Sequence, residues 1–361
     1  MFSEYNFRNY NFRLLFYVLA LNLVGVVVIN SAVGGLMLAI AISLMDYRKL
    51  MKCCGLVYIG CVGILLAVIV AGQLGGFGGG SRRWIDLPVI GRFQPSEFVK
   101  IGLIFFFSWF LQKNQEKINR PSVLVTAAVL AAVPLALILK QPDLSTSIVI
   151  VFFILCLIYM AGISYKWIAG ALAVAVPSLA LVVWLAEHNM MPFLEPYQIN
   201  RILAFINPGK YAELNLQQDN SKMAIGSGRL YGKGLFNDTA ISVKNGNFLS
   251  EEHTDFIFSV IGEELGFIGC MIVLLLFLLF VFECLRMASR ARDMAGRLFC
   301  TGMAALVGFQ SFTNIAVATG VFPNTGLPLP FISYGVSSLA SLYIGIGILL
   351  NVGLQQRKLE F

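Results

Sequence analysis

The chain has 361 residues, of which 58% are hydrophobic and only 12% are charged. This composition excludes a soluble globular domain, in which about a quarter of the residues are charged. The formal net charge of +7 could indicate an anionic polymer as partner, but the positions of the lysines and arginines account for the excess without a nucleic acid.

Apolar runs recur along the whole chain, and most are long enough to cross the hydrocarbon core as helices. Strands of a membrane β-barrel would alternate apolar and polar residues instead. We therefore expect an all-α integral membrane protein, a single polytopic domain over residues 1–361 with a large outer loop at about 188–254. The ten expected transmembrane helices cover residues 14–30, 33–45, 53–72, 96–111, 122–139, 144–162, 166–187, 256–283, 297–320 and 332–354.

The basic residues gather in alternate connections between these runs. By the positive-inside rule, the side that carries them is cytoplasmic, so both termini are expected inside and the outer loop outside. We expect no cleavable leader, because no small-residue cleavage signature follows the first apolar run. The cytoplasmic set comprises Arg8, Arg13, Arg48, Lys49, Lys52, Lys113, Lys117, Arg120, Lys166, Arg286, Arg290, Arg292, Arg297, Arg357 and Lys358.

The first two expected spans are unusually short. Residues 14–45 are almost continuously apolar, yet at about 1.5 Å per residue they are too few for two full crossings and a turn. A single crossing would invert every later connection against the charge rule. We therefore keep two crossings and hypothesise that a loop and parts of both helices are absent around Ala32 and Val33.

The cysteines and histidines give no metal-binding pattern. Seven cysteines lie in or beside the apolar runs without a C-x-x-C pair of the metal type, and there are only two histidines. We interpret the cysteines as small packing residues and expect no structural metal site.

Two polar clusters interrupt the apolar pattern in the first half of the chain. Glu97 and Lys100 lie three residues apart after a helix-start signal, and so share one helical face. They could simply pair to stay buried, or they could shape a polar cavity. Arg82 and its neighbour Arg83 lie outside, against the charge rule; their partner is either a lipid headgroup or a diphosphate that joins a lipid to a sugar. Asp143 follows Pro142 as an ordinary helix start.

A third cluster occupies the outer segment and the start of the next span. Glycines beside its cations permit close approach to a phosphate-bearing ligand, although a solvated loop would have a similar composition. Asp255 lies at a helix start, where it could cap the helix, act in catalysis, or do both. Glu263 and Glu264 lie deeper and need partners. The cations are Arg201, Lys222, Arg229 and Lys233.

Five ordered segments resemble the signature segments of the RodA/FtsW/SpoVE family, also called SEDS proteins. This resemblance implies ten spans with both ends inside, and a glycosyltransferase that polymerises lipid II beside a class B penicillin-binding protein. The segments are RRWID...FQPSEFVK (82–100), QPDLSTS (141–147), SKMAIGSGRLYGKG (221–234), HTDFIFSVIGEELGFIG (253–269) and FPNTGLPLPFISYGVSSL (322–339).

Carried over by motif, the resemblance implies that Asp255 is the essential catalytic carboxylate and that Glu97 and Lys100 face a central cavity. The resemblance also makes five basic residues candidate ligands for diphosphates: Arg82, Arg201, Lys222, Arg229 and Lys233. The chain departs from the family in its short first loop and in Val336, where a second glycine is common in SYGGSS.

The implied reaction needs few protein groups. A sugar 4-hydroxyl of lipid II attacks the anomeric carbon of the growing strand and displaces undecaprenyl diphosphate. The protein must supply a base for the hydroxyl proton and cations for the leaving diphosphate. A divalent cation, Mg²⁺ or Mn²⁺, could assist the basic residues in binding the diphosphate. A single displacement converts the α-linked donor into a β-1,4 linkage, so we expect inversion.

Other interpretations remain open. Intramembrane Glu and Lys residues would also suit a lipid II flippase, although the motif residues concentrate at the outer ends of spans. A non-catalytic scaffold of the elongation or division machinery is a third possibility. Within the family, TGLPLPF and QPDLSTS favour the elongation branch, RodA, over the division or sporulation branches. The expected location is the bacterial cytoplasmic membrane.

Overall fold

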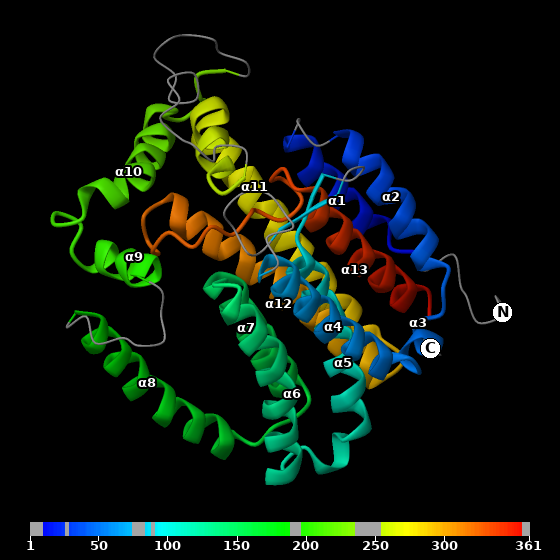
Figure 1. The fold of residues 1–361 in the computed structure, drawn as a ribbon. Helices are drawn as coiled ribbons and strands as arrows, with labels where there is room; N and C mark the ends of the chain where they lie inside the picture. Colours follow the sequence, from blue (N-terminus) through cyan, green and yellow to red (C-terminus); the bar gives the residue numbers. More distant parts are fainter. Residues whose placement is uncertain are drawn as a thin grey trace. The chain divides into compact units, whose positions relative to one another are not determined.

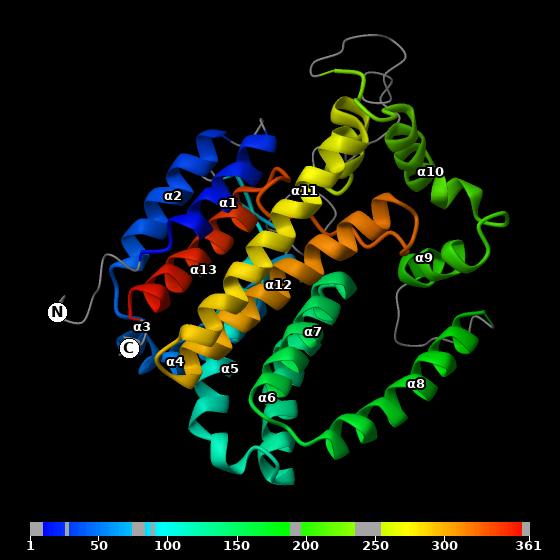
Figure 2. The ribbon, with the colours of Figure 1, turned by 180° about the vertical axis from the view of Figure 1, so that it is seen from behind.

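The computed structural model describes residues 10–25, 29–73, 84–87, 91–187, 196–234 and 254–355. It is predominantly helical (Figures 1 and 2). Its helices are α1 Phe12–Val24, α2 Ile29–Ser43, α3 Tyr47–Met51, α4 Cys54–Gln73, α5 Pro95–Lys113, α6 Pro121–Lys140, α7 Leu144–Met160, α8 Tyr165–Glu187, α9 Pro196–Ile206, α10 Ala212–Ser227, α11 Ile257–Arg290, α12 Met294–Ala318 and α13 Val336–Leu354.

Each expected apolar run contains a helix, but several details differ from the expectation. Within the described residues, α6, α11, α12 and α13 are long and apolar enough to cross a membrane, and five further apolar helices are shorter. The chain is therefore a multi-pass membrane protein by composition and helix length. The expected outer loop contains two helices, α9 and α10, and an unexpected antiparallel strand pair precedes α5: β1 (Ile85–Leu87) and β2 (Gly91–Phe93).

The chain forms two compact units. The first draws on residues 1–162, 275–310 and 330–361, and the second on residues 163–274 and 311–329. Helices α11 and α12 each contribute residues to both units.

In the first unit, α13 packs along α2 and against α5, while α4 packs on α5 and α6. Figure 1 shows red α13 beside blue α2, elements from opposite ends of the chain. Small residues permit this approach: a side chain at Gly35 would collide with the Tyr343 ring, and a Cβ at Gly347 would lie 2.7 Å from the Ala39 carbonyl. Close packing through small residues is the usual means of helix association in lipid.

The first two helices are short, as the sequence predicted. Helix α1 has 13 residues and α2 has 15, fewer than the roughly 20 needed for a full crossing. Helix α2 begins at Ile29, so the backbone is helical at Ala32 and Val33, where we had placed the loop; α1 ends four residues before α2 begins. The hypothesis of an absent segment stays a prediction.

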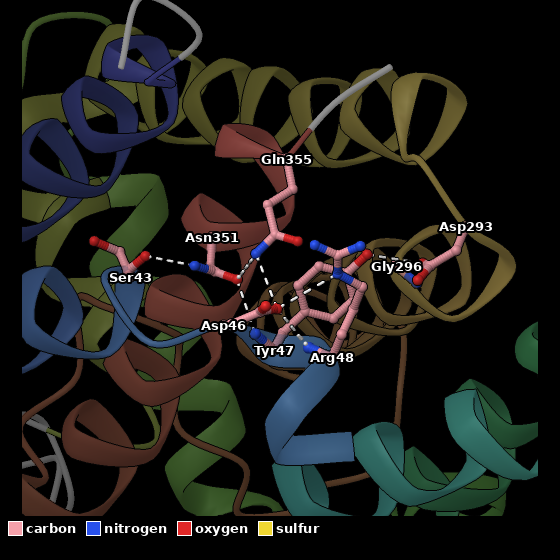
Figure 3. A network of polar contacts seen from close by, with 8 residues as sticks. All are labelled: Ser43, Asp46, Tyr47, Arg48, Asp293, Gly296, Asn351 and Gln355. Carbon is pink, nitrogen blue, oxygen red and sulfur yellow. Dashed lines mark hydrogen bonds and ion pairs between the residues drawn. The ribbon is translucent and has the colours of Figure 1, made fainter. Parts of the chain in front are cut away.

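A polar network ties the ends of α2 and α13 to the start of α12 (Figure 3). The backbone N–H of Tyr47 donates to Asn351 Oδ1 at 2.9 Å, and the Tyr47 hydroxyl donates to Asp293 Oδ1 at 2.8 Å. Asn351 Nδ2 donates in turn to the Ser43 carbonyl at 2.7 Å. Burial, followed by the nearby Asp293 carboxylate, raises the pKa of Tyr47 well above its usual value, so the hydroxyl keeps its proton.

Asp46 is the acidic end of this network. It caps α3 by accepting from the Arg48 backbone N–H at 3.0 Å, and it accepts a second bond from Gln355 Nε2 at 3.1 Å. Burial raises the pKa of Asp46, but the bond from Gln355 and the contacts with Arg48 together outweigh burial, so the pKa falls below its ordinary value.

The cysteines are free and mostly enclosed, as packing residues should be. Cys53 alone among them is exposed.

Candidate functional site

The first unit holds a buried ion pair at the start of α5. Pro95 occupies the first turn, and the Lys100 ammonium lies 2.8 Å from Glu97 Oε1. Lys100 Nζ also donates to Gln310 Oε1 of α12 at 3.0 Å. Glu97 and Lys100 are each only 2% exposed, which confirms their predicted pairing on one helical face. A charge this deeply buried requires such partners.

Three motif segments meet beside this pair. The backbone N–H of Gln94 donates to Ser337 Oγ at 3.1 Å, and its side-chain amide donates to Asp143 Oδ2 at 3.4 Å. Asp143 also caps α7, accepting from the backbone N–H of Thr146 at 3.1 Å and from its hydroxyl at 2.9 Å. The predicted helix start at Asp143 is therefore confirmed, and the cap also contacts the FQPSEF segment.

The second unit places the Asp255 carboxylate beside a cation. Asp255 lies in the turn before α11 and is half-buried, while Arg201 projects from α9. Both approach the backbone of Gly326: a Cβ built there would lie 3.2 Å from Asp255 Oδ2 and 3.8 Å from Arg201 Nη1. Gly326 has a φ of 71°, which a glycine adopts without strain. A carboxylate and a guanidinium therefore share one corner of this unit.

The Asn314 side chain joins the backbone at Asp255 to the backbone at Leu327, next to Gly326. Its side-chain nitrogen donates to the Asp255 carbonyl at 2.8 Å and to the Leu327 carbonyl at 2.6 Å. The residue is 1% exposed on α12. We did not predict Asn314, although an amide inside a membrane-spanning helix is a signal that could have identified it.

Two of the predicted diphosphate ligands have carboxylate partners of their own. Lys222 Nζ lies 2.6 Å from Asp219 Oδ1, and Lys233 Nζ lies 2.6 Å from Glu263 Oε1. Glu263 is buried, so its expected need for a partner is confirmed, whereas Lys222 is half-exposed. Arg229 is exposed.

The glycines around Arg229 and Lys233 pack against a break in α11. A side chain at Gly228 or Gly232 would collide with carbonyls of α11, at Gly262 and Glu264. The segment 228–234, which we call the glycine segment, therefore needs glycine at positions 228 and 232 to approach this helix. Backbone packing explains these two glycines without a bound phosphate.

The break itself lies at Gly266, whose φ of 65° and ψ of −163° interrupt the helical path. Four hydrogen bonds with the glycine segment replace helical bonds there. They run from Lys233 N to Glu263 O (2.9 Å), Gly234 N to Glu264 O (3.0 Å), Phe267 N to Arg229 O (2.8 Å) and Ile268 N to Leu230 O (3.2 Å). A broken membrane helix is tolerated where neighbouring protein satisfies its backbone in this way.

Arg82 lies outside the described residues. Within them, no group of three or more His, Cys, Asp and Glu side chains comes together to hold a metal ion.

A family model described as "Cell cycle protein", FTSW_RODA_SPOVE, matches residues 23–358. The chain belongs to this family. One similar protein is the probable peptidoglycan glycosyltransferase FtsW of Geobacter metallireducens. It is 37% identical to this chain over 314 residues, which cover 86% of this chain and 80% of the relative. The peptidoglycan glycosyltransferase MrdB of Escherichia coli is 34% identical over 308 residues, covering 84% and 78%.

Solved structures of similar proteins share the fold. One, described as "Structural coordination of polymerization and crosslinking by a peptidoglycan synthase complex", has a TM-score of 0.76 and 30% identity, and covers 95% of this chain and 97% of that chain. The rod shape determining protein RodA of Thermus thermophilus has a TM-score of 0.67 at 28% identity, covering 95% and 96%. The family member described here therefore has a RodA-like fold.

Proposed function

We propose that the chain is a peptidoglycan glycosyltransferase that polymerises lipid II into β-1,4 glycan strands at the outer face of the cytoplasmic membrane. The similarity to relatives named as peptidoglycan glycosyltransferases supports this proposal across more than four fifths of the chain. Within the molecule, the observation that carries it is the approach of the Asp255 carboxylate and the Arg201 guanidinium to one backbone position, Gly326.

These two groups match the needs of the reaction. The Asp255 carboxylate takes the proton from the 4-hydroxyl of the incoming lipid II as its oxygen forms a bond to the anomeric carbon. The bond from that carbon to the diphosphate breaks, and undecaprenyl diphosphate leaves with the electron pair. Arg201 stabilises the negative charge that develops on the diphosphate, because a guanidinium can donate two parallel hydrogen bonds to phosphate oxygens.

We infer a single displacement with inversion at the anomeric carbon. In this scheme Asp255 acts as a base and forms no bond to the sugar. A covalent sugar adduct on Asp255, trapped with a slow substrate and detected by mass spectrometry, would contradict this step.

The buried pair in the first unit has a different role. The Lys100 ammonium already has Glu97 and Gln310 within hydrogen-bond distance. We therefore assign Glu97 and Lys100 to shaping a polar cavity, in which their charges balance. Lys222, Arg229, Lys233 and Arg82 stay candidates for contacts with the diphosphate of either substrate, with a divalent cation as a further candidate.

We propose the following setting in the cell. The chain forms one polytopic domain with ten spans, both termini in the cytoplasm and the α9–α10 segment outside, as the distribution of basic residues predicts. A class B penicillin-binding protein supplies the transpeptidase, consistent with a similar protein solved in a peptidoglycan synthase complex. We assign the chain to elongation and cell shape, with the division or sporulation polymerase as the alternative.

The test is polymerisation of labelled lipid II by the purified protein with its penicillin-binding partner and Mg²⁺ or Mn²⁺. Wild type should form long glycan strands on a gel, and a folded Asp255→Ala variant should form none. Equal activity of the two proteins would remove Asp255 from the mechanism.

The same samples also test the flippase alternative, which the buried charges of Glu97 and Lys100 favour. Reconstitution in vesicles with fluorescent lipid II measures its movement between leaflets. Movement of lipid II without strand formation would support the flippase and overturn the polymerase.

A further inference from the structure

The buried amide of Asn314 holds two backbone segments of the second unit on one nitrogen atom. One acceptor is the carbonyl of Asp255 and the other is the carbonyl of Leu327, at 2.8 Å and 2.6 Å. The two acceptors are 72 residues apart in sequence, and neither lies within a helix. Both bonds are short enough to be well formed.

The bond to Leu327 holds the loop that lies next to the Asp255 carboxylate. Leu327 directly follows Gly326, and a Cβ at Gly326 would lie 3.2 Å from Asp255 Oδ2. Asn314 thus binds the main chain of Asp255 and also binds the loop that contains Gly326, which approaches the Asp255 side chain. Loss of either bond removes one restraint on the position of the carboxylate relative to Gly326.

Gln218 provides a matched comparison in the same unit. Its side-chain nitrogen also bridges two carbonyls, those of Val317 at 2.8 Å and Phe322 at 2.7 Å. Gln218 is buried and therefore contributes to the stability of this unit in a similar way. Its acceptors, however, lie at the end of α12 and near the start of the loop that follows it, rather than at Asp255 and Leu327.

We propose that Asn314 is a positioning residue for the catalytic carboxylate, which it aligns through the main chain of Asp255. This inference rests on the proposed function. Only a neutral side chain with two N–H donors can serve both carbonyls, because an ionised carboxylate donates no hydrogen bond and would repel both oxygens. A protonated carboxyl of the same shape has one O–H donor and can serve one of them.

The experiment compares Asn314→Asp with Gln218→Glu, each assayed for lipid II polymerisation with the penicillin-binding partner across a range of pH. Both variants are expected to unfold at a lower temperature than wild type. For Asn314→Asp we expect kcat per folded molecule to fall about tenfold or more near neutral pH, with KM for lipid II unchanged. The ratio of its kcat to that of wild type should rise as the pH is lowered and the introduced carboxyl gains a proton. Gln218→Glu should keep the wild-type kcat per folded molecule.

Asn314→Ser covers the case in which Asn314→Asp does not fold. Its shorter side chain has one donor and serves at most one of the two carbonyls, so we expect a lower kcat with an unchanged KM. Wild-type kcat in the folded Asn314 variants would overturn the inference, and so would a pH-independent loss in Asn314→Asp that Gln218→Glu shares. Movement of lipid II between leaflets without strand formation by wild type would instead overturn the proposed function, and the two failures are therefore distinguishable.

Discussion

The break in α11 yields a strong prediction about stability. At Gly266 the φ of 65° with a ψ of −163° lies in a region that is essentially restricted to glycine, and another residue there costs about 1–3 kcal/mol. An alanine Cβ would also collide with the backbone nitrogen of Gly232 and lie 2.7 Å from the Leu230 carbonyl. The glycine segment would have to move away from α11.

That movement would break some of the four hydrogen bonds that join the two elements. Loss of two of them costs about 1–3 kcal/mol in addition to the strain, so Gly266→Ala should lower the free energy of unfolding by roughly 2–6 kcal/mol. Gly226→Ala is the matched control, because Gly226 lies in α10 with open space around its Cα. Alanine is favoured over glycine in a helix, so this control should be as stable as wild type or slightly more stable.

Thermal unfolding in detergent, followed by the reaction of newly exposed cysteines with a fluorescent maleimide, measures the difference. Cys270, one turn beyond the break, is buried and free, so it becomes reactive when this region opens. An unfolding midpoint of Gly266→Ala equal to that of the Gly226→Ala control would refute the reasoning.

Three further predictions concern other positions. Gly326→Ala should reduce kcat for lipid II polymerisation at least tenfold in a folded protein, because the added methyl group would strain the backbone and press on the Asp255 carboxylate. Tyr47→Phe should lower the unfolding midpoint through a loss of about 1.5–3 kcal/mol, since it removes the partly buried hydrogen bond to the Asp293 carboxylate. The lowered pKa of Asp46 stabilises the fold above its ordinary value of 3.8, and this stabilisation is lost as the pH falls through the lower folded value. Thermal scans below about pH 4 should therefore show a smaller acid dependence for Asp46→Asn than for wild type.

Features that depend on neighbours in sequence could be predicted. The Glu97–Lys100 pair follows from a spacing of three residues on a helix, and the Asp143 cap follows from its place before a helical run. The apolar runs likewise located the helices, because lipid requires long apolar segments whose backbone bonds are satisfied internally.

Features that depend on residues far apart in sequence could not be predicted. The glycines beside Arg229 and Lys233 are equally compatible with a phosphate loop and with helix packing, and only the position of the α11 break distinguishes these alternatives. Asn314 cannot be told from the other polar residues of α12, such as Gln310 and Thr313, until its two distant carbonyl acceptors are known.

The most direct test of the central claim is the rate of lipid II polymerisation by Asp255→Asn. This substitution keeps the shape of the side chain, and with it the packing against Gly326, but removes the base. With the penicillin-binding partner present and the fold verified by thermal unfolding, we predict no glycan strands from Asp255→Asn where wild type forms long ones. Strand formation at the wild-type rate would contradict the assignment of Asp255 as the catalytic carboxylate.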